Sequence, residues 1–293
     1  MEFLEILKNI TSEENIFINE PMSKHTTFKT GGIADFLVIP QNKSEMVELL
    51  KLDIKKTIIG NGSNLLVKDG GIRGLVIKTT GLNNYKVEDD IIVAESGILL
   101  SKLSNIAKDN DLTGLEFACG IPGTLGGAVM MNASAYGGET SNVVVETEYA
   151  DLNGNVYKTT NHEFGYRKSL FMEKSYIILE SKIKLEKGNK EEIAAKMKEL
   201  MDSRNSKQPI NKPSAGSTFK RPEGYFAGKL IEDAGLKGYK IGGASVSNLH
   251  AGFVINDGDA TSEDILELIK YIQNKVKNEF GVDLEPEVRI IGE

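Results

Sequence analysis

The chain contains one glycine-rich nonapeptide, Gly120-Ile121-Pro122-Gly123-Thr124-Leu125-Gly126-Gly127-Ala128. Four of its nine residues are Gly and one is Pro. A regular helix or strand gains nothing from this composition, because each Gly destabilises such an element by about 0.5–1 kcal/mol relative to Ala. Close approach of the backbone to a bound ligand explains the glycines better, although a structural cluster of turns also uses Gly for tight packing.

A second glycine-containing loop, Gly60-Asn61-Gly62-Ser63-Asn64, lies between two strand-like runs. Glycine tolerates positive φ, so backbone N–H groups can converge there on an anion such as phosphate. The alternative is an ordinary Asn-Gly hairpin turn, which needs no ligand. The loop lacks the Lys of a P-loop, and Leu65 stands where a dinucleotide fingerprint needs Gly, so neither motif fits. Together the two loops indicate an extended, phosphate-containing cofactor such as a dinucleotide.

The overall composition is that of a folded globular protein. The chain has 293 residues, 40% hydrophobic and 26% charged, and at about 150 residues per domain this length predicts two domains. The net charge of −7 disfavours nucleic-acid and membrane partners, and no obligate protein partner is evident. The single cysteine, Cys119, cannot form an intrachain disulfide, and the acidic N-terminus does not resemble a signal peptide, so we expect a cytoplasmic protein.

Hydrophobic periodicity predicts a mixed α and β chain. Strands are expected at residues 36–39, 57–59, 65–67, 75–77, 91–94, 143–150, 155–159, 176–185, 250–256 and 288–291. Helices are expected at residues 44–50, 101–109, 189–205, 225–234 and 261–280. Thr261 and Asp264 predict a capping box for the last helix, and Gly281 predicts its end. Pro, Gly and small polar residues at 206–217 favour a domain boundary there.

A basic segment begins near this boundary. From Asp202 to Lys240 the chain has eight Lys or Arg and four Asp or Glu, a local charge of +4. Scattered surface lysines are the usual explanation of such a segment. Here it also contains Ala215-Gly216-Ser217-Thr218-Phe219-Lys220, a small-residue turn that presents a hydroxyl among the charges. The segment is therefore a candidate anion site, although a lone Ser is more often a turn residue than an acid catalyst.

Six short motifs follow one another between Gly60 and Arg289, within a longer matching stretch that runs from about Asn19 to the C-terminus. They are Gly60-Asn61-Gly62-Ser63-Asn64-Leu65-Leu66, Gly120-Ile121-Pro122-Gly123-Thr124-Leu125-Gly126-Gly127, Gly165-Tyr166-Arg167-x-Ser169, Ala215-Gly216-Ser217-x-Phe219-Lys220, Ala227-Gly228-Lys229-Leu230-Ile231 and Glu285-Pro286-Glu287-Val288-Arg289. In this order and spacing they resemble the motifs of the UDP-N-acetylenolpyruvoylglucosamine reductase family. The chain is similar to the shorter class of that family, which lacks an inserted loop with an extra substrate-covering Tyr. Arg221 departs from the pattern, because many relatives have Asn there.

The resemblance implies an α+β fold: a two-lobed FAD-binding domain of the vanillyl-alcohol-oxidase (PCMH) type and a smaller α+β substrate-binding domain. We expect the FAD-binding domain at residues 1–205, with lobes at about 1–80 and 81–205. The substrate-binding domain is expected at 206–280, followed by a C-terminal segment, 281–293, that carries Glu287. These boundaries combine the resemblance with the composition of the linker.

The resemblance also implies a reaction in peptidoglycan precursor synthesis. It is the NADPH-dependent reduction of UDP-N-acetylglucosamine enolpyruvate, a UDP-sugar, to UDP-N-acetylmuramate. Noncovalent FAD transfers the hydride to C3 of the enolpyruvyl group, and C2 is protonated. Negative charge then builds at C2 and on the substrate carboxylate, and this charge needs stabilisation and a proton.

The motifs imply roles for individual residues. Ser217 is expected to protonate C2, and Arg167 and Glu287 are expected to hold and polarise the substrate carboxylate. A carboxylate beside another must be protonated or paired with a cation, so we expect Glu287 to be protonated or hydrogen-bonded. The residues expected at FAD are Gly60, Asn61, Gly62, Ser63, Asn64, Gly120, Gly123, Thr124, Gly126 and Gly127. The residues expected at the substrate are Tyr166, Arg204, Lys207 and Lys229.

Simpler interpretations stand beside these roles. Without the motifs, Arg167 would be read as a surface ion pair and Glu287 as a solvated strand-end residue. The three histidines, His25, His162 and His250, show no metal-ligand spacing, so no metal site is expected, and His250 reads as a structural histidine. Two alternative functions share the sequence features: an FAD-dependent sugar or alcohol oxidase of the same fold, and a nucleotide-sugar-binding regulator without turnover.

Overall fold

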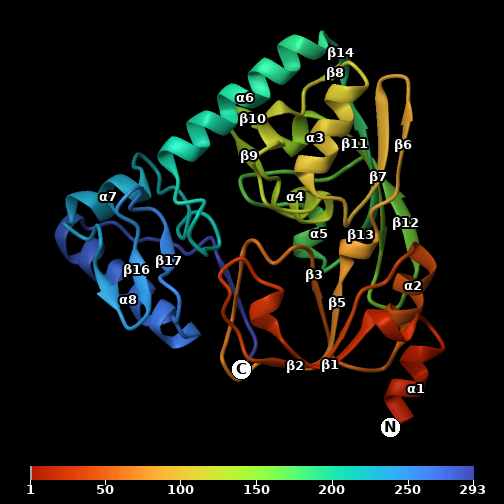
Figure 1. Ribbon diagram of the computed structural model, residues 1–293, viewed down its shortest axis with the longest axis horizontal. Helices are drawn as coiled ribbons and strands as arrows, with labels where there is room; N and C mark the ends of the chain where they lie inside the picture. The colour runs from red at the N-terminus through yellow and green to blue at the C-terminus, as the bar shows by residue number, and fades with distance from the viewer. Residues whose placement is uncertain (1) are drawn as a thin grey trace. The chain divides into compact units, whose positions relative to one another are not determined.

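Local sequence signals set both ends of the longest helix in the computed structural model, which describes residues 2–293 (Figure 1). This helix is α8, Ser262–Phe280. The Asp264 N–H donates to Thr261 Oγ1 at 3.1 Å, and the Asp264 carboxylate accepts from the Thr261 N–H at 3.0 Å. Gly281 ends the helix with a φ of +70°, where Gly avoids the steric cost of a side chain. The predicted capping box and stop are therefore confirmed.

Asparagine caps begin two more helices. Asn189 precedes α6, Lys190–Lys207, as predicted, and its Oδ1 accepts a backbone N–H of the first turn at 3.0 Å. α2, Lys43–Lys51, was expected to start from Ser44, but its N-cap is Asn42. The Asn42 side chain accepts a first-turn N–H at 3.0 Å, which satisfies one of the unpaired donors at the helix start.

The chain divides into two compact units. The first unit comprises the chain up to Ile18, Phe36–Asn61 and Gly74–Ser203, and the second comprises Asn19–Asp35, Gly62–Arg73 and Arg204–Glu293. The early segments 19–35 and 62–73 thus pack with the C-terminal part of the chain, whereas the predicted FAD-binding domain takes in the whole of 1–205. Because those predicted domains are defined by what they bind, they stay a prediction.

Two large hydrophobic clusters lie in the first unit, beside a smaller one around Cys119 and Met197. One gathers side chains of residues 7–82 with Ala150, Ile177 and Leu179, and the other gathers side chains of residues 92–185. A five-stranded sheet of order β12-β11-β13-β7-β6 carries the second core, and α4 packs on β13 and β7 (Figure 1). The elements of this unit are α1 (Glu2–Lys8), α2, β3 (Lys56–Ile59), β6 (Tyr85–Glu88), β7 (Ile91–Glu95), α3 (Leu100–Asp109), β8 (Leu112–Thr113), α4 (Leu125–Met131), β9 (Ser134–Ala135), β10 (Gly138–Glu139), β11 (Val144–Ala150), β12 (Val156–Thr159), α5 (Leu170–Glu173), β13 (Ile177–Lys184), β14 (Glu186–Lys187) and most of α6.

A further sheet has the order β1-β2-β5-β3. The division between the units passes through three of its strands, β1 (Ile16–Pro21), β2 (Ile33–Val38) and β5 (Ile72–Lys78). β3 and β5 are parallel, with Ile59 aligned to Lys78, so both strands end at the same edge of the sheet. The loop that starts at Gly60 leaves the sheet at this edge.

The second unit is built around α8. This helix packs against the antiparallel strands β15, β16 and β17 and against α7 (Figure 1). Strand β18 pairs in parallel with β4, and Arg289 is aligned with Leu65. This pairing holds the C-terminal segment beside the chain that follows Gly62. The elements of this unit are β4 (Leu65–Val67), α7 (Ala227–Asp233), β15 (Lys240–Ile241), β16 (Ala244–Val246), β17 (Val254–Asn256), α8 and β18 (Arg289–Ile291).

Long apolar runs were predicted well and short elements poorly. The strand expected at 250–256 is only β17, because the Ser247 hydroxyl accepts the N–H groups of Leu249 and His250 and turns the preceding chain. α4 begins inside the glycine-rich nonapeptide, where helix propensity is low, and its bounds were not predicted. Its packing on β13 and β7 and the cap from Thr124, which accepts the Gly127 N–H, stabilise it instead. The other elements not predicted are α1, α5, β1, β6, β8, β9, β10, β14, β15 and β16.

Candidate functional site

The two glycine-containing loops meet within the first unit. The Asn61 Nδ2 donates to the Pro122 carbonyl at 2.7 Å. A Cβ placed on Gly60 would lie 2.6 Å from Thr124 Oγ1, closer than side-chain atoms can approach. Gly60 is thus required so that the end of β3 can reach the nonapeptide. The sequence singled out both loops, and the fold places them side by side.

The glycines of the nonapeptide have different environments. A Cβ on Gly126 would lie 2.8 Å from Cβ of Ser96, so tight packing explains this Gly. Ser96 is 1% exposed, and its hydroxyl has no hydrogen-bond partner among residues 2–293. Gly127 is exposed, and a Cβ there would meet only Thr124 Oγ1 at 3.5 Å. Only Gly127 of these two leaves backbone open to a ligand.

The second half of the Gly60–Asn64 loop belongs to the second unit, where it lies beside Glu287. The Asn64 Nδ2 donates to the Glu287 carbonyl at 3.1 Å, and the Arg289 N–H donates to the Asn64 carbonyl at 2.9 Å. Gly62 has a φ of +68°, and a Cβ there would lie 2.1 Å from the His25 carbonyl oxygen. A residue expected at the cofactor therefore holds the backbone of one expected at the substrate.

Ser217 and Glu287 are brought together by backbone pairing. The Glu287 N–H donates to the Thr218 carbonyl at 2.8 Å, and Phe219 and Pro286 form an antiparallel bridge. Ser217 is exposed and follows Gly216, whose φ is +78°. Two residues that are 70 positions apart in the chain thus lie on neighbouring segments of one unit.

Arg167 belongs to the first unit, in a two-residue turn. Gly165 and Lys168 exchange backbone hydrogen bonds of 3.1 and 3.3 Å, and Arg167 between them has a φ of +55°. Its Nη1 donates to Ser134 Oγ at 2.8 Å, and its Cζ lies 5.3 Å from the centre of the Tyr166 ring. The half-buried guanidinium is therefore oriented by Ser134 and by the Tyr166 ring. Tyr166 itself is 59% exposed.

Asn132 supports this turn and was not predicted. It ends α4 with a φ of +43°, its Nδ2 donates to the Gly165 carbonyl at 3.3 Å, and its Oδ1 accepts the Ser141 N–H at 3.0 Å. Asn is the commonest residue after Gly at a left-handed helix end. The Asn at position 132 was a possible signal for a helix end, but it can be interpreted in this way only once α4 is known to end there.

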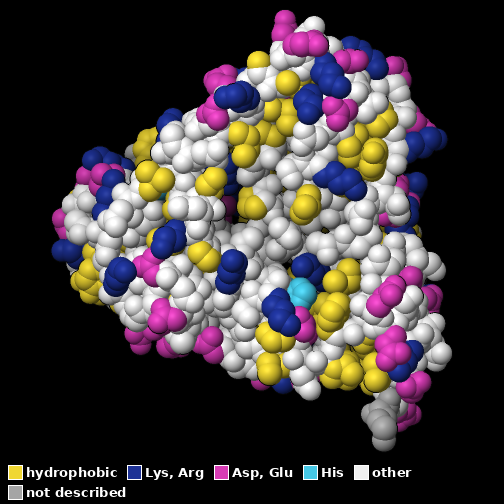
Figure 2. Space-filling model, viewed as in Figure 1, with side chains coloured by type: hydrophobic (Ala, Val, Ile, Leu, Met, Phe, Trp, Pro, Cys, Tyr) yellow, Lys and Arg dark blue, Asp and Glu magenta, His cyan; other side chains and the backbone are white. Residues whose placement is uncertain are grey.

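The basic segment is largely neutralised in the folded protein. Lys229 pairs with Asp233 and Lys237 with Glu232, while Lys212 and Lys240 both pair with Asp257. The hydrogen bond to Asp233 raises the pKa of Lys229. Arg204 and Lys207 lie in the last turn of α6. On the face shown in Figure 2, Lys and Arg are interspersed with Asp and Glu, so the +4 read from the sequence does not form one basic surface there.

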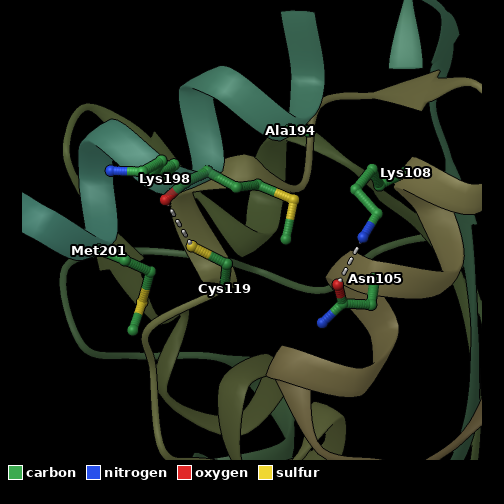
Figure 3. Close-up of a pocket in the computed structure, with 7 residues that line it drawn as sticks. Asn105, Lys108, Cys119, Ala194, Lys198 and Met201 are labelled. Carbon is green, nitrogen blue, oxygen red and sulfur yellow. Dashed lines mark hydrogen bonds between the residues drawn. The ribbon is translucent and has the colours of Figure 1, made fainter. Parts of the chain in front are cut away.

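The first unit also contains an open pocket of about 310 Å³ between α3 and α6, and none of its lining residues is a predicted site residue (Figure 3). Met197, Met201 and Ala194 line its apolar part. Cys119 borders it, is buried, and its thiol lies 3.8 Å from the Met197 carbonyl oxygen. Cys119 is thus a buried packing residue.

The described residues, 2–293, include no group of three His, Cys, Asp or Glu that could hold a metal ion. The Nε2 atom of His25 lies 3.0 Å from Oε1 of Glu20. The Nε2 atom of His162 forms a 3.0 Å hydrogen bond with Oγ1 of the buried Thr147. Burial lowers the pKa of His162 and also that of His250. In the same part of the chain, no helix is both long and apolar enough to cross a lipid bilayer.

Comparisons with known proteins cover nearly the whole chain. The C-terminal domain family of UDP-N-acetylenolpyruvoylglucosamine reductase matches residues 208–291, and an FAD-binding domain family matches residues 34–160. The UDP-N-acetylenolpyruvoylglucosamine reductase of Caldanaerobacter subterraneus subsp. tengcongensis is 54% identical over 98% of this chain and 97% of its own length. That of Clostridium perfringens is 51% identical over 100% of this chain and 98% of its own.

Solved structures agree with these sequence matches. The UDP-N-acetylenolpyruvylglucosamine reductase of Thermus caldophilus is 34% identical, with a TM-score of 0.82 over 92% of this chain and 97% of its own. Phl p 4, a grass pollen allergen with glucose dehydrogenase activity, has a TM-score of 0.51 at 13% identity, over 63% of this chain and 44% of its own. The second likeness concerns the fold alone. The predicted fold class, an FAD-binding α+β fold with a smaller α+β part, is confirmed.

Proposed function

Because the chain belongs to the UDP-N-acetylenolpyruvoylglucosamine reductase family, we propose how its own residues divide the work of that family's reaction. The protein is an FAD-containing oxidoreductase that uses NADPH to reduce UDP-N-acetylglucosamine enolpyruvate in peptidoglycan precursor synthesis. We propose that Ser217 donates the proton to C2 of the substrate. Arg167 and Glu287 bind and polarise its carboxylate.

The residues around the two loops suit FAD. The Gly60 approach to Thr124 joins the loops, and Gly127 leaves backbone open beside them. We propose that FAD is held, without a covalent bond, by Gly60, Asn61, Gly62, Ser63, Asn64, Gly120, Gly123, Thr124, Gly126 and Gly127. When bound, FAD supplies the carrier that takes a hydride from NADPH and delivers it to C3 of the enolpyruvyl group. The protein's own part is to hold the substrate and to supply a proton.

Hydride addition at C3 leaves charge at C2 and on the carboxylate, and the proposed residues answer both demands. An exposed hydroxyl at Ser217 can donate a proton to C2, and the planar Arg167 guanidinium can grip a carboxylate with two parallel hydrogen bonds. Glu287 can share that carboxylate only if it is protonated or compensated by a cation. This requirement is consistent with a Glu287 that acts together with Arg167.

One observation carries the proposal: the hydrogen bond from the Glu287 N–H to the Thr218 carbonyl. Residues 217 and 287 come from separate motifs, and nothing in the sequence forces them together. The main-chain bond between Thr218 and Glu287 brings their segments side by side in the second unit, as expected if Ser217 and Glu287 face the same substrate group. Arg167, oriented by Ser134 and Tyr166, would be contributed by the first unit.

The UDP part of the substrate needs cations for its diphosphate. We propose Arg204, Lys207 and Lys229 for this role and Tyr166 as a further substrate contact. Lys229 already pairs with Asp233 on an exposed helix face, so its share of the binding is expected to be small. We place the reaction in the cytoplasm, which suits a chain whose single cysteine, Cys119, is buried and cannot form an intrachain disulfide.

Anaerobic absorbance spectroscopy tests the proposed function. The flavin absorbance of the purified protein should bleach on addition of NADPH and recover on addition of the enolpyruvyl substrate. A sugar or alcohol oxidase would instead consume oxygen when a sugar is added. A regulator without turnover would bind the UDP-sugar without recolouring the reduced protein, and this outcome would contradict the proposal.

A further inference from the structure

The imidazole of His250 is closely packed in the second unit. Its expected structural role does not account for the way its contacts lead toward Ser217. Its ring lies between two glycines: a Cβ on Gly228 would be 3.1 Å from the ring, and a Cβ on Gly252 would be 3.0 Å from it. Phe253 meets the ring edge-on, with centres 5.1 Å apart. Both glycines therefore allow the imidazole to sit against bare backbone, where larger residues would displace it.

The ring accepts a directed hydrogen bond in this position. The Gly252 N–H donates to His250 Nδ1 at 3.1 Å. Nδ1 must be unprotonated to accept it, so the neutral ring carries its proton on Nε2. A doubly protonated ring would present a donor to another donor and lose the bond. Burial lowers the pKa of His250, so the neutral ring that accepts this bond persists to a lower pH than an ordinary imidazole does.

The same loop is bonded to the proposed proton donor. The Gly252 carbonyl accepts the Thr218 N–H at 2.8 Å, and Thr218 directly follows Ser217. Thr218 is 2% exposed and has two more partners: its Oγ1 accepts the Val254 N–H at 2.9 Å, and its carbonyl accepts the Glu287 N–H at 2.8 Å. The backbone at residue 218 is thus held from two sides, by the 250–254 loop and by the segment of Glu287.

We propose that His250 is a positioning residue, which acts through Gly252 and Thr218 to hold Ser217 in place relative to Glu287. This inference rests on the proposed function of Ser217. Two consecutive hydrogen bonds support it: one joins His250 Nδ1 to the Gly252 N–H, and the other joins the Gly252 carbonyl to the Thr218 N–H. It is distinct from a catalytic role, because nothing in it requires the imidazole to touch the substrate.

The charged groups around the ring do not supply an alternative partner for Nδ1. Lys237 lowers the pKa of His250 and Glu232 raises it, and these two side chains form an ion pair of 2.8 Å with each other. Lys229, which follows Gly228 in α7, pairs with Asp233. The state of the ring is therefore set mainly by its burial.

Two substitutions distinguish the hydrogen-bond acceptor role of His250 from the packing role of its ring. His250→Phe keeps an aromatic ring between the glycines but removes the acceptor. His250→Asn loses most of the ring but places Oδ1 where it can accept the N–H two residues later, as Asn commonly does in turns. Phe253→Leu is the matched packing control, because it removes the edge contact and leaves the Gly252 bond. For each protein we would measure bound flavin, melting temperature, the rate of reduction by NADPH and the rate of reoxidation by the enolpyruvyl substrate.

His250→Phe should slow reoxidation by about 10- to 100-fold, in line with the cost of a displaced reacting group, while bound flavin and the reduction rate stay at the parent level. His250→Asn should recover most of the reoxidation rate, and Phe253→Leu should lower only the melting temperature. The inference is overturned if His250→Phe and His250→Asn reoxidise equally fast, or if Phe253→Leu slows reoxidation as much as His250→Phe.

The pH profile keeps the test open even if His250→Phe does not fold. The parent reoxidation rate should fall in acid as the ring gains its second proton, and His250→Asn should lack this fall because an amide does not titrate. Coincident profiles would contradict the inference. Ser217→Ala separates its failure from that of the proposed function. If Ser217→Ala reoxidises at the parent rate, the role of Ser217 is wrong; if only Ser217→Ala is slow, the role of His250 alone is wrong.

Discussion

Arg167 in the first unit and Ser217 in the second are held in different ways. The turn of Arg167 depends on side chains: Asn132 bonds the Gly165 carbonyl, Ser134 accepts from the guanidinium, and Ser169 Oγ donates to the Met130 carbonyl at 2.7 Å. The segment of Ser217 depends on main-chain bonds, from Thr218 to Gly252 and to Glu287.

This difference predicts how each of the two regions responds to mutation. A position held mainly by main-chain bonds tolerates most side-chain changes, so most substitutions in the second unit should act through the group removed. His250 and Thr218 are exceptions, because their side chains bond the same backbone. A position held by side chains depends on its neighbours, and Arg167 is also in the left-handed region, which costs a non-Gly residue about 1–2 kcal/mol. Substitutions around Arg167 should therefore misplace the guanidinium as well as remove contacts.

The largest effect is expected at Ser217. Ser217→Ala removes the proposed proton donor and leaves the main-chain bonds of Thr218 in place. Reoxidation by the enolpyruvyl substrate should slow by about 10²–10⁴-fold, the usual loss for a general acid, while reduction by NADPH continues at the parent rate. Stopped-flow absorbance of the flavin measures both half-reactions. Parent rates in both would show that Ser217 is not the acid.

Arg167→Lys should come next. It keeps the positive charge but loses the planar fork, and one ammonium cannot reproduce two parallel bonds to a carboxylate. We expect reoxidation to slow by about 10²-fold, as for a misplaced reacting group. Ser134→Ala keeps the fork and removes only its hydroxyl partner, so it should cost less. Equal rates for Arg167→Lys and the parent, with a lower melting temperature, would make Arg167 structural.

Glu287→Gln tests the second unit by a milder change. The amide keeps the shape and a donor, and the Glu287 N–H still bonds the Thr218 carbonyl. A protonated Glu287 therefore predicts a loss of reoxidation of only about tenfold, equivalent to one hydrogen bond. The same stopped-flow measurement decides the point. A near-complete loss would mean that Glu287 acts as an ionised base.

Asp257→Asn tests stability in the second unit without touching the proposed site. Lys240, Ser245 and Lys212 bond the Asp257 carboxylate and lower its pKa to about 2. Because the folded-state pKa is below the unfolded one, the carboxylate stabilises the fold above about pH 4. This stabilisation is lost as the pH falls through 2. At pH 7 the melting temperature should drop by about 2–4 °C, and the parent and variant should converge near pH 2. A drop that persists at pH 2 would exclude the charge as its cause.

The smallest effect is expected at Lys229. Lys229→Ala should raise the substrate KM by about two- to threefold, since exposed ion pairs contribute little, and it should leave bound flavin unchanged. Added salt should weaken substrate binding in the parent more than in the variant. The same measurements on Arg204→Gln, at the end of α6, show whether a second proposed cation contributes to substrate binding in the same way. Binding that is independent of salt in both proteins would remove the electrostatic argument for this set.

The sequence suggested candidate residues for the chemistry more readily than the residues that support them. Ser217, Arg167 and Glu287 could be named because each stands in a motif with a recognisable spacing. Asn132 and Thr218 could not, because their importance depends on partners that are distant in the chain. Gly126 shows a different case. It was expected near a ligand, and the fold adds a packing requirement that the sequence did not reveal, because a Cβ there would lie 2.8 Å from Cβ of Ser96.

The sequence by itself determined the long helices, the longer strands and the positions of the two glycine-containing loops. Caps, periodicity and Gly act within a few residues, so a linear pattern is enough to read them. Tertiary structure alone decided that segments 19–35 and 62–73 pack with the C-terminal part, that the Gly60 loop is shared by both units, and that Glu287 pairs beside Ser217. These arrangements follow from the burial of apolar side chains and the pairing of main-chain groups far apart in the chain, which no local pattern encodes.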